Sequence, residues 1–231
     1  MTTRMGRVLS INVGQARTFE YNRHPARSAI WKTPVGGRIA ARGVNLEGDE
    51  QADRKAHGGP DKAIYAYAVE DILWCEQQIG RSIQYGGVGE NLTTEGIEVN
   101  DALVGECWEI GSTVLEVSEP RVPCWRLGVR MDDKLFPRPF TKALRPGAYL
   151  RIIVEGDLAS GDKIRVIYRP DHDLTIRDVF RIYSRDRNEV ERLAAISQMS
   201  DSWKRWAENL LEKAGRKAES KQAPLRGFPE M

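Results

Sequence analysis

The chain has 231 residues, of which 41% are hydrophobic and 29% are charged, and its net charge is +2. This length allows one main domain and a small second one. The near-neutral charge gives no basic field for nucleic acid, and no apolar run reaches the roughly 20 residues of a membrane helix. The N-terminus lacks an apolar run of signal-peptide length, and Cys75, Cys107 and Cys124 have no metal-type spacing. We therefore expect a reduced, cytoplasmic protein.

Residues 5–168 alternate apolar and polar positions and contain many glycines, which predicts a mainly β domain over 1–169, a barrel or a sandwich. Short strands are predicted at 8–13, 64–68, 107–110, 114–117, 149–154 and 164–167. A hairpin turn is predicted at Gly111-Ser112, and a loop between strands over 156–162. Apolar residues at helical spacing predict one helix over 70–79. The polar segment 47–59 is typical of a binding loop.

The periodicity changes after Pro170. Thr175 and Asp178 form a capping-box pattern ahead of apolar residues at helical spacing. Two more short helices are predicted around 190–196 and 203–211, so that 170–214 would form a small three-helix domain. Residues 215–231 are polar and aperiodic, which predicts a disordered tail.

One candidate for chemistry is Cys124, which follows Pro123 at the end of an apolar strand pattern and lies between Arg121 and Arg126. Cationic neighbours favour the thiolate, the form of cysteine that attacks electrophiles and binds soft metals. A buried structural thiol is the alternative interpretation. Cys75 and Cys107 lie within predicted elements and are expected to be core or surface thiols.

A second candidate is the segment that begins at His57. Gly58 and Gly59 allow backbone conformations that are closed to other residues, and they let a ligand approach the chain closely. Exposed amides there, together with Arg54 and Lys62, could hold a phosphate or another oxyanion. A simple turn before a strand is the alternative interpretation.

Three motifs together resemble the MOSC domain, the molybdenum cofactor sulfurase C-terminal domain. They are His57-Gly58-Gly59-Pro60-Asp61-Lys62-Ala63, Gly89-Glu90-Asn91-Leu92-Thr93 and Pro120-Arg121-Val122-Pro123-Cys124. The resemblance covers about residues 5–210 and is to the YiiM-like group, which carries a C-terminal three-helix domain. In this chain Trp125 and Arg126 follow the cysteine, where many relatives are expected to have lysine directly after it. This difference leaves the thiol intact and keeps a cation two residues on.

The resemblance implies a MOSC-type β-barrel with a few helices and a molybdenum cofactor (molybdopterin) whose metal is bound by Cys124. It also implies reduction of N-hydroxylated compounds such as hydroxylaminopurine-type base analogues, with electrons from an external reductase. His57 is the candidate acid for protonating the departing hydroxyl. The residues that would bind the cofactor are Arg54, His57, Gly58, Gly59, Lys62, Glu90, Asn91 and Arg126.

Two other functions remain open. One is a carrier that holds the cofactor or a sulfane sulfur on Cys124 without turnover, and the other is a metal-free transferase that uses Cys124 and His57. The C-terminal helices hold no motif of the site, so we expect them to pack on the barrel or bind a partner rather than take part in chemistry. Trp203 and Trp206 would anchor that packing, or a docking surface for the electron donor or the second subunit of a homodimer. No nucleic-acid or membrane partner is expected.

Overall fold

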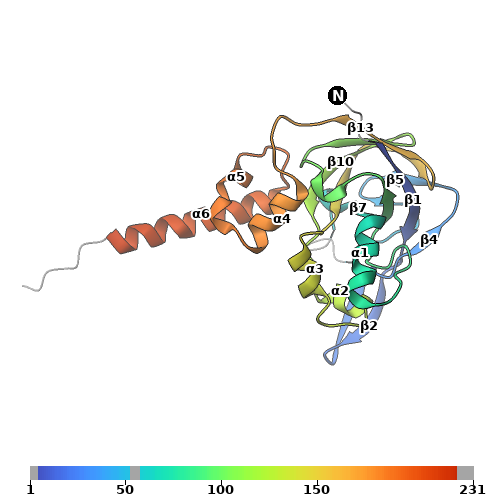
Figure 1. Ribbon diagram of the computed structural model, residues 1–231, viewed down its shortest axis with the longest axis horizontal. Coiled ribbons are helices and arrows are strands. Elements are labelled where there is room, and N and C mark those ends of the chain that lie inside the picture. Colours follow the sequence, from blue (N-terminus) through green and yellow to red (C-terminus); the bar gives the residue numbers. More distant parts are fainter. Residues whose placement is uncertain (1–4, 53–57, 223–231) are drawn as a thin grey trace, which may run out of the picture.

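The computed structural model describes residues 5–52 and 58–222, with side chains as far as residue 216. Its centre is a closed seven-stranded β-barrel (Figure 1), which confirms the predicted mainly β fold. In pairing order the strands are β13 (Lys163–Tyr168), β9 (Cys107–Ile110), β10 (Thr113–Pro120), β11 (Ala148–Val154), β7 (Ile64–Ala68), β8 (Leu92–Glu95) and β1 (Met5–Val13). Pairing of β13 with β1 closes the barrel, and β7 and β8 are its parallel pair. A short strand, β4 (Thr33–Val35), also pairs with β1.

Alternating side chains fill the barrel, as the period of two in its strands requires. On β10, for example, Leu115 and Val117 are fully buried, while Val114 and Glu116 between them are partly exposed. Fully buried residues from other strands complete this core. They include Val8, Ile11, Ile64, Leu92, Trp108, Ile110, Leu150 and Ile164.

Two smaller sheets lie beside the barrel. One contains β12 (Gly156–Ala159), β5 (Arg38–Arg42) and β6 (Asn45–Leu46), and the other is the hairpin of β2 (Arg17–Tyr21) and β3 (His24–Ser28). The prediction of a loop over 156–162 is therefore wrong for its first four residues. Gly156 pairs with Ala41, a partner more than a hundred positions away that no local pattern can reveal.

Helices in the segments between the barrel strands pack beside the barrel. They are η1 (Pro60–Lys62), α1 (Val69–Ile79), η2 (Val99–Asp101), α2 (Trp125–Arg130) and α3 (Pro137–Ala143). The predicted helix over 70–79 is confirmed as α1, whereas α2 and α3 were not predicted. A second buried cluster joins α1, α2 and α3 to β7 and contains Cys75 on α1, which is therefore a core thiol.

The C-terminal segment is helical, as its periodicity predicts. It forms α4 (Ile176–Ser184), η3 (Arg187–Glu189), α5 (Glu191–Ala194) and α6 (Asp201–Gln222), and the capping box of Thr175 and Asp178 begins α4. Figure 1 shows these helices grouped on one side of the barrel, with the end of α6 extending away from it. Their apolar residues belong to the same buried cluster as the barrel core. The division into two domains at residue 169 stays a prediction.

The helix α6 continues beyond Gly215 to Gln222, so the prediction of a disordered tail is wrong for 215–222. The residues around Gly215 are mostly alanine, lysine, arginine and glutamate, and such strong helix formers carry a helix across one glycine. Residues 223–231 lie outside the described residues. None of the described helices combines the length and the apolar character needed to cross a membrane.

Candidate functional site

Cys124 follows the end of β10, directly precedes α2 and is half-buried. It lines two cavities. The polar cavity is lined by residues that include Lys32, Asp49, Asn91, Arg121 and Arg126, and the aromatic cavity by residues that include Glu119, Tyr183, Trp203 and Trp206. Both cavities are also lined by Lys62, Val122 and Tyr149. The structure therefore brings together four of the predicted site residues, namely Lys62, Asn91, Cys124 and Arg126.

The loop before β7 places Lys62 between the two cavities. Gly59 has φ 95° and ψ 178°, a conformation that strains residues with a side chain. The side chain of Gln51 holds this loop: its Oε1 accepts a 2.8 Å hydrogen bond from the Gly59 amide, and its Nε2 donates to the carbonyls of Val44 and Lys62. Gly59 thus shapes the loop, and neither Gly58 nor Gly59 belongs to the described lining of the cavities. Gln51 was not predicted.

Asn91 lines the polar cavity, but its amide also joins three parts of the fold. Its Oδ1 accepts from the Tyr65 backbone at 3.1 Å. Its Nδ2 donates to the Asn12 carbonyl at 3.1 Å and to Asp49 Oδ2 at 2.9 Å. Asn91 therefore fixes the wall of the cavity by tying β7, β1 and the Asp49 loop together.

Glu90 was expected to bind the cofactor, and the structure places it behind the wall. It is fully buried, and its carboxylate accepts from the amides of Gly86 (2.5 Å) and Val88 (3.1 Å) and from the Thr93 hydroxyl (3.0 Å). Burial raises the pKa of this carboxyl, and these hydrogen bonds oppose the rise. Glu90 holds the turn that ends at Gly89, which does line the polar cavity.

The described part of the polar cavity carries more positive than negative side chains. The cations are Arg27, Lys32, Lys62, Arg121 and Arg126, and the carboxylates are Asp49 and Glu50. Lys32 pairs with Asp49 at 2.5 Å, deep in the protein, and burial lowers the pKa of Lys32 against the opposing charge of Asp49. Glu50 pairs with Arg27 at 2.6 Å. Each of these two carboxylates pairs with one of the five cations, so positive side chains outnumber negative ones in the described lining. This excess of positive charge suits an anion.

Arg121 is the most deeply buried cation of this set, with 6% of its surface exposed. Its guanidinium carbon lies 5.5 Å from the ring centroid of Tyr65, and its Nη1 has no hydrogen-bond partner among the described residues. Burial raises the pKa of the neighbouring Tyr149 to about 12, with Arg121 opposing, so the phenol stays protonated. The sequence marked Arg121 only as a neighbour of the cysteine, because a single motif does not show burial.

The C-terminal helices line the aromatic cavity beside Cys124. Tyr183 of α4 and Trp203 and Trp206 of α6 form a cluster whose ring centroids lie 5.2–5.7 Å apart, and all three line the aromatic cavity with Cys124. The helices pack on the barrel, as expected, and they also line a cavity beside Cys124. That they take no part in the chemistry stays a prediction. The helical spacing of the tryptophans predicts that they lie on one face of a helix, but it does not show which residues that face contacts.

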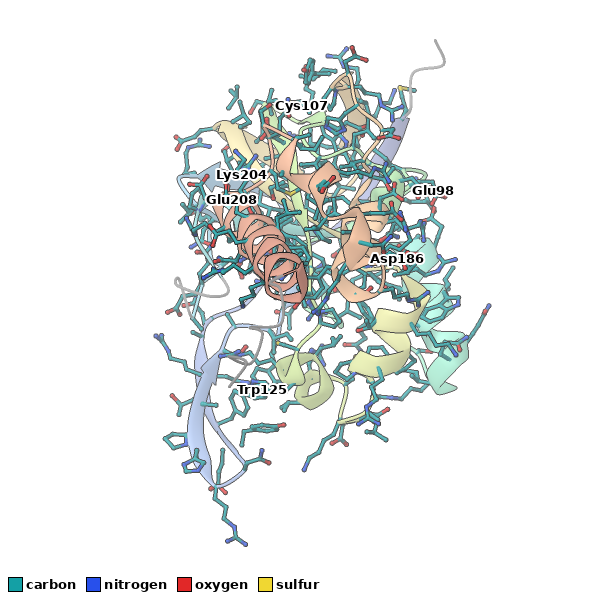
Figure 2. The ribbon with its side chains drawn as sticks, turned by 90° about the vertical axis from the view of Figure 1, so that its left-hand side faces the viewer. Glu98, Cys107, Trp125, Asp186, Lys204 and Glu208 are labelled. Atoms are coloured by element: carbon teal, nitrogen blue, oxygen red, sulfur yellow. The ribbon has the colours of Figure 1, made fainter. Side chains whose placement is uncertain are left out.

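The neighbourhood of Cys124 also contains Trp125, whose ring stacks on Tyr21 of the β2–β3 hairpin at 4.1 Å. Figure 2 shows Trp125 beside that hairpin and Cys107 far away at the other end of the molecule. Two predicted site residues, Arg54 and His57, lie outside the described residues.

Comparison with known proteins agrees with this arrangement. The MOSC domain family matches residues 53–165. The protein YflK of Bacillus subtilis is 30% identical over 200 residues, which are 85% of this chain and 90% of YflK. The protein YiiM of Escherichia coli is 29% identical over 184 residues, 77% of this chain and 82% of YiiM.

A longer relative and a crystal structure extend the comparison. A protein of Gibberella moniliformis named reductase is 29% identical over 179 residues, which are 74% of this chain but 31% of that protein. The crystal structure of YiiM from Geobacillus stearothermophilus superposes with a TM-score of 0.75 and 27% identity, covering 89% of this chain and 99% of that one. With the barrel and the motif residues around Cys124, these matches show that the chain belongs to the MOSC domain family, in its YiiM-like group.

Proposed function

We propose that this protein is a molybdenum-cofactor-dependent reductase of N-hydroxylated compounds, with the metal bound by the thiolate of Cys124. The observation that carries the proposal is the position of Cys124, a half-buried thiol where a positively charged cavity meets an aromatic one. Thiolate is a ligand that suits a soft metal centre. The fungal relative named reductase supports the reaction class.

The residues of the polar cavity fit a molybdopterin. Its phosphate is an anion, and the buried Nη1 of Arg121 is a donor that lacks a partner in the described structure. Gly89 has φ 89°, and a Cβ there would come within 2.8 Å of a neighbouring side chain, so the wall is closely fitted at this point. No group of three or more His, Cys, Asp or Glu side chains in the described parts of the chain could hold a metal ion. The other metal ligands would then belong to the cofactor.

The charged residues near Cys124 have the following roles in this proposal. When bound, the cofactor supplies the two electrons that reduce the N–O bond, and an external reductase replaces them. Lys62, Arg121 and Arg126 hold the phosphate and the polar edge of the pterin. Arg54 and His57 precede Lys62 in the sequence and lie outside the described residues, and we retain Arg54 as a further phosphate ligand and His57 as a candidate proton donor.

The test compares two cysteine variants produced in a host that makes the cofactor. Cys124→Ser should lose molybdenum, measured by elemental analysis, and lose reduction of hydroxylaminopurine with dithionite as donor, because a neutral hydroxyl is a poor ligand for a soft metal. Its melting temperature should stay close to that of the parent. Cys107→Ser is the matched control: its thiol lies far from the site, half-buried on β9, and both readouts should be retained.

The outcomes separate this function from the two others that the sequence leaves open. Molybdenum in the protein without reductase activity, even with dithionite, would indicate a carrier. Activity that persists in metal-free protein would indicate a cysteine-nucleophile transferase. Full reductase activity of Cys124→Ser would show that the metal is bound elsewhere.

A further inference from the structure

The aromatic cavity lies between the barrel and the C-terminal helices. On the barrel side it is lined by Glu119 and Pro120 at the end of β10 and by Cys124, and on the helical side by Tyr183, Trp203 and Trp206. The polar cavity has a different character, since charged side chains dominate it. Cys124 lines both. A group held by this thiol would therefore be reached by the charged residues of the polar cavity and by the aromatic residues of the other cavity.

The three rings form a cluster of tilted and edge-to-face pairs on the helical side of the cavity. Trp203 is 6% exposed and packs into the core, where it supports the other two rings. Tyr183 and Trp206 are only partly buried, and their centroids lie 5.2 Å apart at an interplanar angle of 52°. Aromatic side chains that line a cavity in this way bind planar heteroaromatic rings by stacking, with little dependence on which base is bound.

The lining of the same cavity includes a buried carboxyl group, Glu119, that has an oxygen without a hydrogen-bond partner among the described residues. The side chain of Glu119 is 3% exposed, and its Oε1 lies 3.3 Å from the Nζ of Lys62. Its Oε2 has no hydrogen-bond partner among the described residues. Buried carboxylate oxygens in folded proteins nearly always have a partner, so this atom can exchange a hydrogen bond with a ligand in the cavity.

We infer that the aromatic cavity is the substrate pocket: a planar, nitrogen-rich ring lies against Tyr183 and Trp206, and its hydroxylamino group lies between Glu119 and Cys124. This inference rests on the proposed function and adds to it the place where the ring of the substrate lies, the residues that hold it, and a proton donor. The reaction is R–NH–OH + 2 e⁻ + 2 H⁺ → R–NH₂ + H₂O. The N–O bond breaks, Glu119 gives one proton to the departing oxygen, which leaves as water, and the nitrogen takes up the second proton from solvent. The electron pair would come from the reduced cofactor.

The surroundings of Glu119 suit that role. Burial raises the pKa of its carboxyl, and the charge of Lys62 and the hydroxyl of Ser200 oppose the rise, while Asp61 adds to it. The protonated acid is therefore available closer to neutral pH than an exposed glutamate would be. Lys62, which also lines the polar cavity, can return a proton to Glu119 after each turnover.

The first test is whether the aromatic residues bind the ring. The protein as purified, without reductant so that no turnover occurs, is titrated with 6-hydroxylaminopurine by calorimetry. Trp206→Ala should weaken the Kd about tenfold or more, the usual effect of losing one stacking partner, and Trp206→Phe should restore most of it. Leu210→Ala is the matched control, because Leu210 lies on the same helix and packs on the core without lining the cavity.

The same variants are then assayed with two substrates, 6-hydroxylaminopurine and hydroxylamine, which has no ring. In Trp206→Ala the ratio of kcat/KM for the purine to that for hydroxylamine should fall about tenfold, mainly through the purine's KM. An unchanged ratio together with an unchanged Kd would show that the aromatic cavity is not the substrate pocket. If the wild-type protein binds the purine but never reduces it, the proposed function is contradicted, whereas the aromatic cavity is still supported as the binding site of the purine.

The second test concerns the proton donor. Glu119→Gln keeps the size and polarity of the side chain but cannot give up a proton, so kcat for both substrates should fall by 10²-fold or more while the Kd for the purine changes little. Glu119→Asp has a carboxyl group on a side chain shorter by one methylene and should show an intermediate kcat. This variant tests the role of Glu119 if the Gln variant folds poorly. Wild-type kcat in Glu119→Gln, with a large loss in His57→Gln, would assign the proton to His57 and contradict the role of Glu119.

Discussion

At the scale of single residues, the site contains acids whose burial opposes their ionisation. Glu119 is the clearest case, because its pKa is raised by burial although Lys62 lies beside it. The folded protein therefore holds the Glu119 proton more tightly than the unfolded chain does. By linkage, stability falls as pH rises through the window between the ordinary pKa of glutamate, about 4.3, and the raised value.

The direction of this pH dependence of stability gives a prediction that can be tested without an activity assay. Glutamine at position 119 cannot ionise, so Glu119→Gln should lack this fall, and its melting temperature relative to wild type should increase from about pH 4 to about pH 8. Thermal scans across this range provide the measurement. Glu109→Gln, which removes a half-exposed carboxylate on β9, controls for a general loss of negative charge. A difference in melting temperature that shrinks toward high pH would contradict the assignment.

At the scale of elements, the turn before β8 depends on one side chain. The carboxylate of Glu90 accepts from the amides of Gly86 and Val88, and an amide in its place would present a donor to one of them. Glu90→Gln should therefore destabilise the protein by roughly 1–3 kcal/mol, the cost of an unsatisfied buried group. It should also weaken cofactor retention, because Gly89 belongs to the same turn.

Urea unfolding measures the first effect and elemental analysis the second. Glu95→Gln is the control, since Glu95 lies at the end of β8 in an exposed ion pair with Arg7 and its loss should change stability by less than about 0.5 kcal/mol. Equal stability of the Glu90 and Glu95 variants would show that the turn does not need the carboxylate.

The elements also show what the sequence could predict. Strands with several buried alternate positions, such as β10, were predicted because their pattern is local. The hairpin of β2 and β3 was not, because its strands are largely exposed and carry little apolar alternation. Its turn places Asn22 and Arg23 at positive φ, where an arginine gives no signal of a turn.

The site was predictable to the same degree. Residues in contiguous motifs, such as Lys62, Asn91 and Cys124, were identified and do meet in space. Residues that act through burial or long-range packing were not. The orphaned donor of Arg121 and the position of Trp206 near the thiol depend on how segments distant in the sequence pack together, which a single sequence does not report.

At the scale of the whole molecule, the barrel and the C-terminal helices share one core. The helical segment contributes fully buried side chains to the same cluster as the barrel strands, among them Ile176, Val179, Ile182 and Leu193. Burial of each such side chain is worth about 1.5–3 kcal/mol, whereas the whole fold of a typical protein is stable by only about 5–15 kcal/mol. The barrel is therefore not expected to remain folded without the helices, although α6 has an exposed end beyond Leu211.

Two truncations test this directly. A chain that stops after Glu212 should keep the melting temperature and molybdenum content of the parent, because the residues described beyond this point are exposed. A chain that stops after Pro170 should aggregate or lose cooperative unfolding, because it uncovers the apolar side of the barrel and removes the wall of the aromatic cavity. Circular dichroism melts and elemental analysis of both chains provide the measurement. A shorter chain that unfolds cooperatively, retains molybdenum and reduces 6-hydroxylaminopurine with dithionite at the parent's rate would show that the helices serve neither the core nor the pocket.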